Sequence, residues 1–157
     1  MTGEALFIGI ATIAVVIAGF TGITAGLGGP DGDRDAGQKL RQRAIVSTSL
    51  NVTFESLAPP VLFAITADER ISIVLASAGV AVYALAIVLV RGRQMLRSGA
   101  LARRGAQVMF VAGPLATLLF AANALYFMSS GVFGLALLVQ LSVAAVSFYT
   151  LVSNATR

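Results

Sequence analysis

The chain of 157 residues contains no cysteine, no histidine and no tryptophan. Without cysteine there is no disulfide, no thiol chemistry and no cysteine-ligated zinc or iron–sulfur centre. Without histidine, a histidine-ligated haem, a histidine proton relay and a Ser/His/Asp triad are excluded as well. The sequence also has no Gly-Lys-Ser/Thr phosphate loop and no nucleophile–base pair. We therefore expect neither an enzyme nor a cofactor-binding protein.

Charged residues are scarce too, at 11%, whereas hydrophobic residues make up 57% of the chain. A soluble domain is about one quarter charged, so this composition excludes an ordinary soluble domain. Twelve of the eighteen charged residues fall in segments 31–43 and 91–104, and long uncharged stretches flank these segments. This pattern is typical of membrane spans joined by loops. It predicts one all-α, multi-pass transmembrane domain over residues 1–157.

Five apolar stretches are long enough to cross a bilayer as helices. They lie at about 5–27, 44–67, 71–90, 107–128 and 133–152. No basic residue precedes the first stretch, which is longer than the apolar core of a signal peptide, so we expect a retained helix. The short connection Asp68-Glu69-Arg70 predicts that the second and third spans form an antiparallel hairpin.

The basic residues predict the orientation of these spans. Segment 28–43 holds four of the eleven Lys/Arg residues, segment 91–106 holds five and the C-terminus one, whereas Arg70 lies on the opposite side. The positive-inside rule then places the N-terminus outside and the C-terminus in the cytoplasm of the cell (inner) membrane. We expect the bilayer as the partner rather than a nucleic acid. The arginines expected near anionic headgroups are Arg91, Arg93, Arg97, Arg103 and Arg104.

Glu55 is the only ionisable residue well inside a predicted span. It lies roughly 16 Å along the second span, near the bilayer midplane. A carboxylate at this depth costs roughly 3 kcal/mol or more unless it faces protein, water or a partner. Steps of four residues place Asn51, Ser47 and Arg43 on the same face. These four residues form a polar stripe that runs from the cytoplasmic edge to the carboxyl group.

Two prolines follow Glu55 in the same span. Pro59 and Pro60 have no N–H, so the carbonyl groups of Glu55 and Ser56 lose their helical donors. Free carbonyls, a carboxylate and the Asn51 amide are hard oxygen ligands that suit a cation or a relayed proton. The predicted ion pathway consists of Glu55, Asn51, Ser47 and Ser56.

A structural interpretation of the same residues stays open. A neutral Glu55 would hydrogen-bond to Asn123 or Gln140 and join helices without moving an ion. Pro59 and Pro60 would then only kink the second span, as Pro114 does in the fourth. Asn123 and Gln140 are in either case expected to make polar contacts between helices.

Two further patterns have simpler interpretations. Small residues repeat every four positions in the first span and predict close packing against another helix, within the chain or between subunits. They are Ala14, Ala18, Gly22 and Gly26.

Asp31, Asp33 and Asp35 have the spacing of a calcium loop, but Ala36 and Gln42 occupy the positions where such a loop needs Gly and Glu. We expect a solvated loop there, and no metal site.

Short segments in or next to each predicted span resemble a known group of proteins. These segments are Ile17-Ala18-Gly19-Phe20-Thr21-Gly22, Leu40-Arg41-Gln42-Arg43, Arg91-Gly92-Arg93, Asn123-Ala124-Leu125 and Gly131-Val132-Phe133-Gly134. In them the chain resembles small five-span bacterial inner-membrane proteins. The resemblance implies a five-span fold and no particular activity. It does not extend to Glu55, because the group is apolar before its proline.

These observations lead to one main functional hypothesis and two alternatives. The main hypothesis is a homo-oligomeric ion channel or ion pathway, in which the second span faces the axis and Glu55 selects cations. The first alternative is a non-catalytic accessory or scaffold subunit that binds another membrane protein through the small residues of the first span. The second is a small proton-coupled transporter with Glu55 as the proton carrier.

Overall fold

The computed structural model describes the backbone of residues 1–27, 36–98 and 104–155, and the side chains of 1–24, 42–90, 93 and 112–153. This part of the chain is helical, as the sequence predicts. Five long α-helices follow one another, with a short π-helix before the last. They are α1 (Glu4–Leu27), α2 (Ala36–Thr66), α3 (Glu69–Ser98), α4 (Arg104–Ala122), η2 (Asn123–Phe127) and α5 (Ser130–Ala155). Asp31, Asp33 and Asp35 lie outside the described residues.

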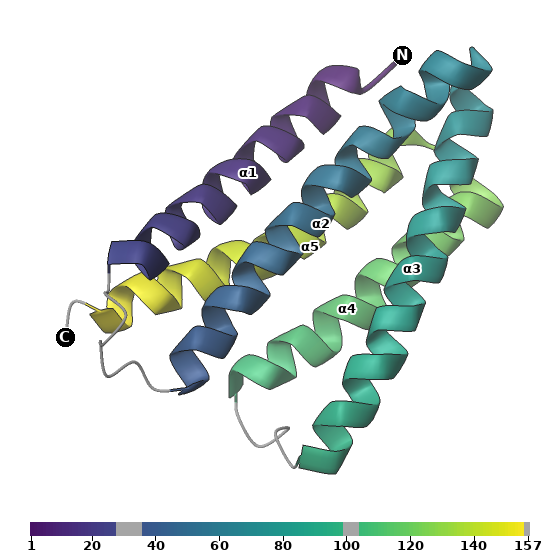
Figure 1. The fold of residues 1–157 in the computed structure, drawn as a ribbon. Coiled ribbons are helices and arrows are strands. Elements are labelled where there is room, and N and C mark those ends of the chain that lie inside the picture. The colour runs from purple at the N-terminus through teal and green to yellow at the C-terminus, as the bar shows by residue number, and fades with distance from the viewer. Residues whose placement is uncertain (28–35, 99–103, 156–157) are drawn as a thin grey trace.

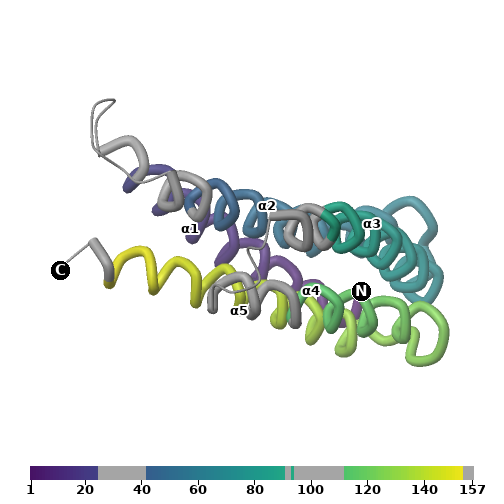
Figure 2. The backbone as a smooth tube through the Cα atoms, turned by 90° about the horizontal axis from the view of Figure 1, so that it is seen from below, coloured from purple at the N-terminus to yellow at the C-terminus, as the bar shows by residue number. Residues whose placement is uncertain are grey.

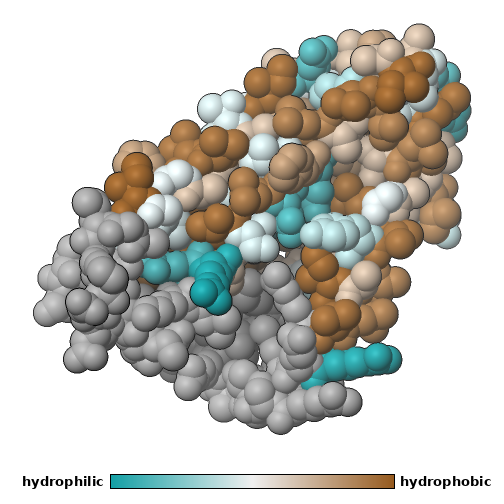
Figure 3. All heavy atoms as spheres, in the orientation of Figure 1, coloured by the Kyte–Doolittle hydropathy of each residue, from teal (hydrophilic) through white to brown (hydrophobic). Residues whose placement is uncertain are grey.

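Three helices are long and apolar enough to cross a membrane, over Glu4–Thr24, Glu69–Val90 and Ser130–Ser153. A shorter apolar helical stretch covers Ala112–Phe127. The surface agrees with this, because hydrophobic side chains cover most of the described part of the face in Figure 3. Large apolar side chains such as Phe20, Val82 and Leu118 are exposed on the surface of the molecule. These features are those of a membrane protein.

The helices form two layers. α1, α2 and α3 lie side by side in one layer, and α4 and α5 form the other (Figures 1 and 2). α5 contacts all the other α-helices, and α2 contacts α1, α3 and α5. Within the described residues α2 and α4 make no contact. The second helix is therefore the centre of its layer, with α5 beneath it.

One end of the bundle, here named the turn end, contains Thr2, the connection between α2 and α3, and the connection between η2 and α5. The Thr2 backbone N–H donates to Glu69 Oε2 at 3.0 Å, and a Cβ on Gly3 would lie 3.2 Å from Ser130 Cβ. The exposed side chains of Arg43 and Arg93 lie toward the opposite end, here named the basic end. Successive helices thus run in alternating directions between the two ends (Figure 1).

Two tight connections at the turn end depend on residues with positive φ. Ala67 (φ 55°) ends α2, and Asp68 Oδ1 then accepts the Ile71 N–H at 2.9 Å as an N-terminal cap of α3. η2 ends at Phe127, and the following Met128 (φ 49°) donates its N–H to the Asn123 carbonyl at 2.8 Å. The sequence did not predict this π-helical turn.

Two helices extend beyond the predicted spans by about two turns at the basic end. α2 begins at Ala36 and α3 continues to Ser98, so much of the basic segments 28–43 and 91–106, expected as loops, is helical. Arg, Lys, Gln, Leu and Met are good helix formers in water as well as in lipid. Hydropathy marks where the apolar stretch stops, and the helix can continue beyond it.

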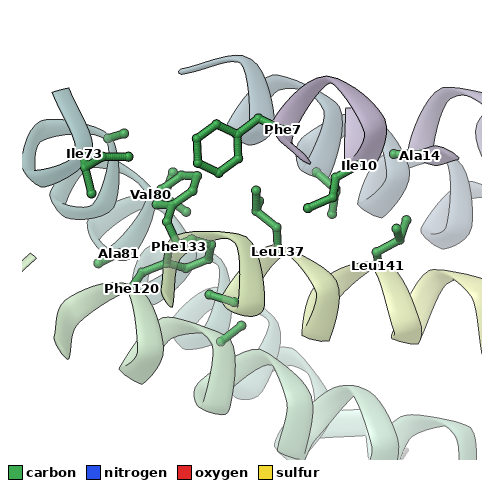
Figure 4. Packing of buried hydrophobic residues seen from close by; sticks show 14 residues of the cluster. Phe7, Ile10, Ala14, Ile73, Val80, Ala81, Phe120, Phe133, Leu137 and Leu141 are labelled. Carbon is green, nitrogen blue, oxygen red and sulfur yellow. The ribbon is translucent and has the colours of Figure 1, made fainter. Parts of the chain in front are cut away.

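The turn-end half of the bundle has an aromatic core. Phe133 of α5 packs edge-to-face against Phe7 of α1 and Phe120 of α4, with ring centroids 5.5 and 5.1 Å apart. All three rings are fully buried, and Leu137 continues the cluster along α5 (Figure 4). This half of the bundle is therefore tightly closed by apolar side chains.

Candidate intramembrane polar site

The central helix α2 buries polar side chains and exposes apolar ones. Ser49, Glu55 and Ser56 are buried. The opposite face of the same helix is exposed and apolar, with Phe54 71% exposed. The other members of that face are Leu50, Leu57, Val61 and Ile65. The exposed apolar face suits contact with lipid, and the buried polar face suits a polar site in the protein interior.

Glu55 lies in the interior of the protomer, with 7% of its surface exposed. The side-chain amide of Gln140 in α5 lies next to its carboxyl group. The second carboxyl oxygen, Oε2, is buried without a hydrogen-bond partner. Along α2, Glu55 lies roughly 16 Å from the turn-end terminus of that helix. Along α5, Gln140 lies roughly 15 Å from the turn-end terminus of its own helix. The two residues therefore lie at the same depth below the turn end.

Asn123, the other partner considered for Glu55, lies elsewhere. Its Nδ2 donates to Ser77 Oγ in α3 at 2.8 Å, and its Oδ1 accepts the Ser129 N–H at 3.0 Å. Asn123 is fully buried. It therefore joins η2 to α3 and fixes the turn into α5, which is a structural role at the turn end.

The polar stripe continues from Glu55 toward the basic end. Asn51 and Ser47 are half-buried, and Arg43 is exposed. The Tyr83 hydroxyl group of α3 donates to Asn51 Oδ1 at 3.3 Å. Sequence reasoning missed Tyr83, although it is the one aromatic residue within the third predicted span. Asn51 and Tyr83 thus connect α2 to α3 on the basic side of Glu55.

The two serines of this region behave differently from each other. Ser56 Oγ donates to the Val52 carbonyl at 2.6 Å, so its side chain is satisfied within α2 and lies about 100° around the helix from Glu55. Only its carbonyl group remains as a candidate ligand. Ser49 Oγ is buried with no partner, and the sequence did not single it out.

The prolines lie inside helices that continue through them. α2 runs without interruption from Ala36 to Thr66 through Pro59 and Pro60, and α4 includes Pro114. Pro59 is fully buried. The carbonyl groups of Glu55 and Ser56 lack the usual helical donors because those positions are prolines. The site therefore combines a free carboxyl oxygen with free backbone carbonyls.

The predicted strip of small residues does not pack as one unit. Ala14 is fully buried in the core and Ala18 is half-buried, but a Cβ on Gly22 would meet nothing within 4 Å. Steps of four residues drift by about 40° per step around a helix, so the strip turns away from its neighbours. Gly26 lies outside the residues whose side-chain surroundings are described. The same is true of four of the predicted headgroup-contacting arginines, Arg91, Arg97, Arg103 and Arg104.

The described residues hold no group of three or more acidic, cysteine or histidine side chains that could bind a metal ion. The site has one carboxyl group, one amide partner and a stripe of neutral polar side chains. A comparison of the chain with known families, curated proteins and solved structures found no match.

Proposed function

We propose that the chain crosses the cell membrane five times, with its N-terminus outside and its C-terminus in the cytoplasm. The alternating direction of the five helices supports this topology, as does the position of Arg70 at the turn end and of Arg43 and Arg93 toward the basic end. The absence of cysteine makes a direct test simple. Asp68→Cys should react with a membrane-impermeant thiol reagent from outside, and Arg93→Cys from the cytoplasm. Reaction of both from one side would contradict the topology.

Within this topology, Glu55 is the ion-binding group of a pathway for protons or small cations. The observation that carries the proposal is its buried Oε2 without a partner. A buried polar atom left unpaired costs about 1–3 kcal/mol, and more when charged. Ionisable groups kept at such a depth mark ion and proton pathways in membrane proteins. The carbonyl groups released by Pro59 and Pro60 add neutral oxygen ligands beside it.

The burial of Glu55 favours a pathway through each protomer over a ring of Glu55 on an oligomer axis. With 7% exposure and the amide of Gln140 of the same chain beside it, Glu55 does not require copies of itself. Association into a homo-oligomer stays a prediction, which native mass spectrometry in detergent tests. A proton-coupled transporter would use the same carboxyl group in the same way.

Ion flux into proteoliposomes tests the functional part of the proposal. Glu55→Gln keeps the size and hydrogen-bonding capacity of the side chain but removes its charge, so cation or proton flux should fall at least about tenfold. Glu4→Gln is the matched control, because Glu4 is an exposed carboxylate in the first turn of α1 and should leave flux unchanged. Equal flux through Glu55→Gln and the control would overturn the role of Glu55.

A further inference from the structure

The polar stripe borders a seam between α2 and α3. The α2–α3 seam is the boundary at which Asn51 of α2 lies beside Tyr83 of α3, with Ser47 and Glu55 one helical turn to either side of Asn51. The two helices are joined tightly at the turn end and diverge toward the basic end (Figures 1 and 2). Figure 3 shows hydrophilic side chains recessed between these helices on an otherwise mostly hydrophobic face. A polar route from the surface toward the interior therefore starts at this seam.

The route toward the turn end is closed. Beyond Glu55, the next position along the stripe is the fully buried Pro59. The edge-to-face contacts of Phe133 with Phe7 and Phe120 fill the same half of the bundle. Closely packed apolar side chains leave no partners for water or an ion. On the stripe face of α2, the polar residues Asn51 and Ser47 lie on the basic side of Glu55, whereas Pro59 and Leu62 lie on its turn-end side.

One hydrogen bond spans the seam on that side. The Tyr83 hydroxyl group donates to Asn51 Oδ1 at 3.3 Å, which is at the long end of the range for such bonds. Tyr83 is 48% exposed, so its ring can swing outward without displacing the core. Asn51 precedes Glu55 by one turn of helix, so this bridge lies directly between Glu55 and the basic end.

Resting on the ion pathway proposed above, we infer that water and hydrated cations or protons reach Glu55 only from the basic end. They pass through the α2–α3 seam, and the Tyr83–Asn51 hydrogen bond is the gate that closes it. The aromatic core is the barrier on the other side. The described conformation, in which this hydrogen bond is formed, is thus the closed state. Breaking the bond opens Glu55 to the compartment that faces the basic end and to no other.

Single cysteines in the cysteine-free chain test this inference. Glu55→Cys probes the site, Ser47→Cys the route, and Leu62→Cys the turn-end half of the same face. Leu50→Cys is the matched control, because Leu50 neighbours Asn51 in sequence but lies on the exposed apolar face of α2. A charged methanethiosulfonate reagent is added from either side of membrane vesicles, and Arg93→Cys marks the side of the basic end.

We expect Ser47→Cys and Glu55→Cys to react from the Arg93 side, and Leu50→Cys and Leu62→Cys to stay unmodified. Adding Tyr83→Phe removes the gate hydroxyl group and should speed the reaction of Glu55→Cys at least about threefold. Reaction of Glu55→Cys from the opposite side would overturn the inference. It would also be overturned if neither Ser47→Cys nor Glu55→Cys reacts when Tyr83→Phe is present. An unchanged rate with Tyr83→Phe would overturn the gate.

The result is separate from the test of the ion pathway. Labelling reports access of water and needs no transport, whereas the flux assay with Glu55→Gln reports the use of the carboxyl group. If the cysteines react from the Arg93 side but Glu55→Gln does not change flux, the access route is supported and the proposed function is overturned. If Glu55→Gln abolishes flux but the cysteines do not react, the proposed function is supported and the access route is overturned. Ser47→Cys keeps the route testable if Glu55→Cys does not fold.

Discussion

Glu55 of α2 and Gln140 of α5 are neighbours at the same depth of the bundle, and Glu55 Oε2 is buried without a hydrogen-bond partner. Gln140 is half-buried, and Glu55 is almost completely so. The contact joins the central helix of one layer to the helix that touches every other. It therefore serves two purposes, because it holds the layers together and keeps one carboxyl oxygen available.

Replacing Gln140 with Leu should destabilise the protein by about 1–3 kcal/mol, because the buried Glu55 carboxyl group then loses its polar neighbour in α5. Adding Glu55→Leu should recover most of this loss, since two apolar side chains leave no unpaired group. Thermal unfolding in detergent measures both. Equal additive losses in the double variant would show that the two side chains do not interact.

Asn123→Ala should lower stability by about 2–4 kcal/mol, because it leaves Ser77 Oγ and the Ser129 N–H without their bonds and opens a gap. Ser142→Ala is the control. Ser142 is exposed and bonds only to the Val139 carbonyl of its own helix, so its loss should change little. The melting temperatures of the two variants provide the comparison. Similar values would contradict the structural role given to Asn123.

Gly134→Val should destabilise the contact between α1 and α5 by about 1–3 kcal/mol. A Cβ at this position would lie 2.7 Å from Leu6 Cδ2, with Phe7 Cε1 at 3.9 Å, so the Leu6 side chain must rotate away and the second γ-methyl group of Val adds to the crowding. Gly22→Val is the counterpart on α1, where a Cβ meets only open space. Its unfolding temperature should not fall. Loss of stability or of assembly with Gly22→Val would mean that another subunit covers this face.

Ala67→Gly should raise stability by about 1 kcal/mol, because Ala67 has a φ of 55° that glycine adopts without strain. Ala64→Gly tests the same exchange inside α2, where Ala64 is exposed and helical. There glycine should cost about 1 kcal/mol. Opposite shifts of the unfolding midpoint are expected, and shifts of the same sign would contradict the assigned turn.

Much of the fold follows from the sequence, because apolar stretches bounded by charge and turn residues specify helices. The five long helices and the α2–α3 hairpin were predicted on that basis. The extension of α2 back to Ala36 and of α3 to Ser98 was not, since hydropathy does not report where a helix ends outside lipid. The π-helical turn at Asn123 depends on bonds to Ser77 and Ser129, which are distant in sequence or set by the turn itself.

The candidate site was predicted less completely than the fold. The period of the α-helix places Glu55, Asn51 and Ser47 on one face, and this needs no tertiary information. The choice between Gln140 and Asn123 as the partner of Glu55 depends on how each helix is rotated in the bundle. The same is true of Tyr83, whose contact with Asn51 only the packed hairpin reveals.

The most direct test of the central claim modifies Glu55 chemically and follows ion flux in the same sample. Dicyclohexylcarbodiimide enters membranes and reacts with carboxyl groups in apolar surroundings, so it should modify Glu55 and spare the exposed Glu4. Wild-type protein in proteoliposomes should carry cations or protons, and flux should fall in proportion to the modified fraction of Glu55 measured by mass spectrometry. Full modification with unchanged flux, or wild-type flux no greater than that of empty liposomes, would contradict the account.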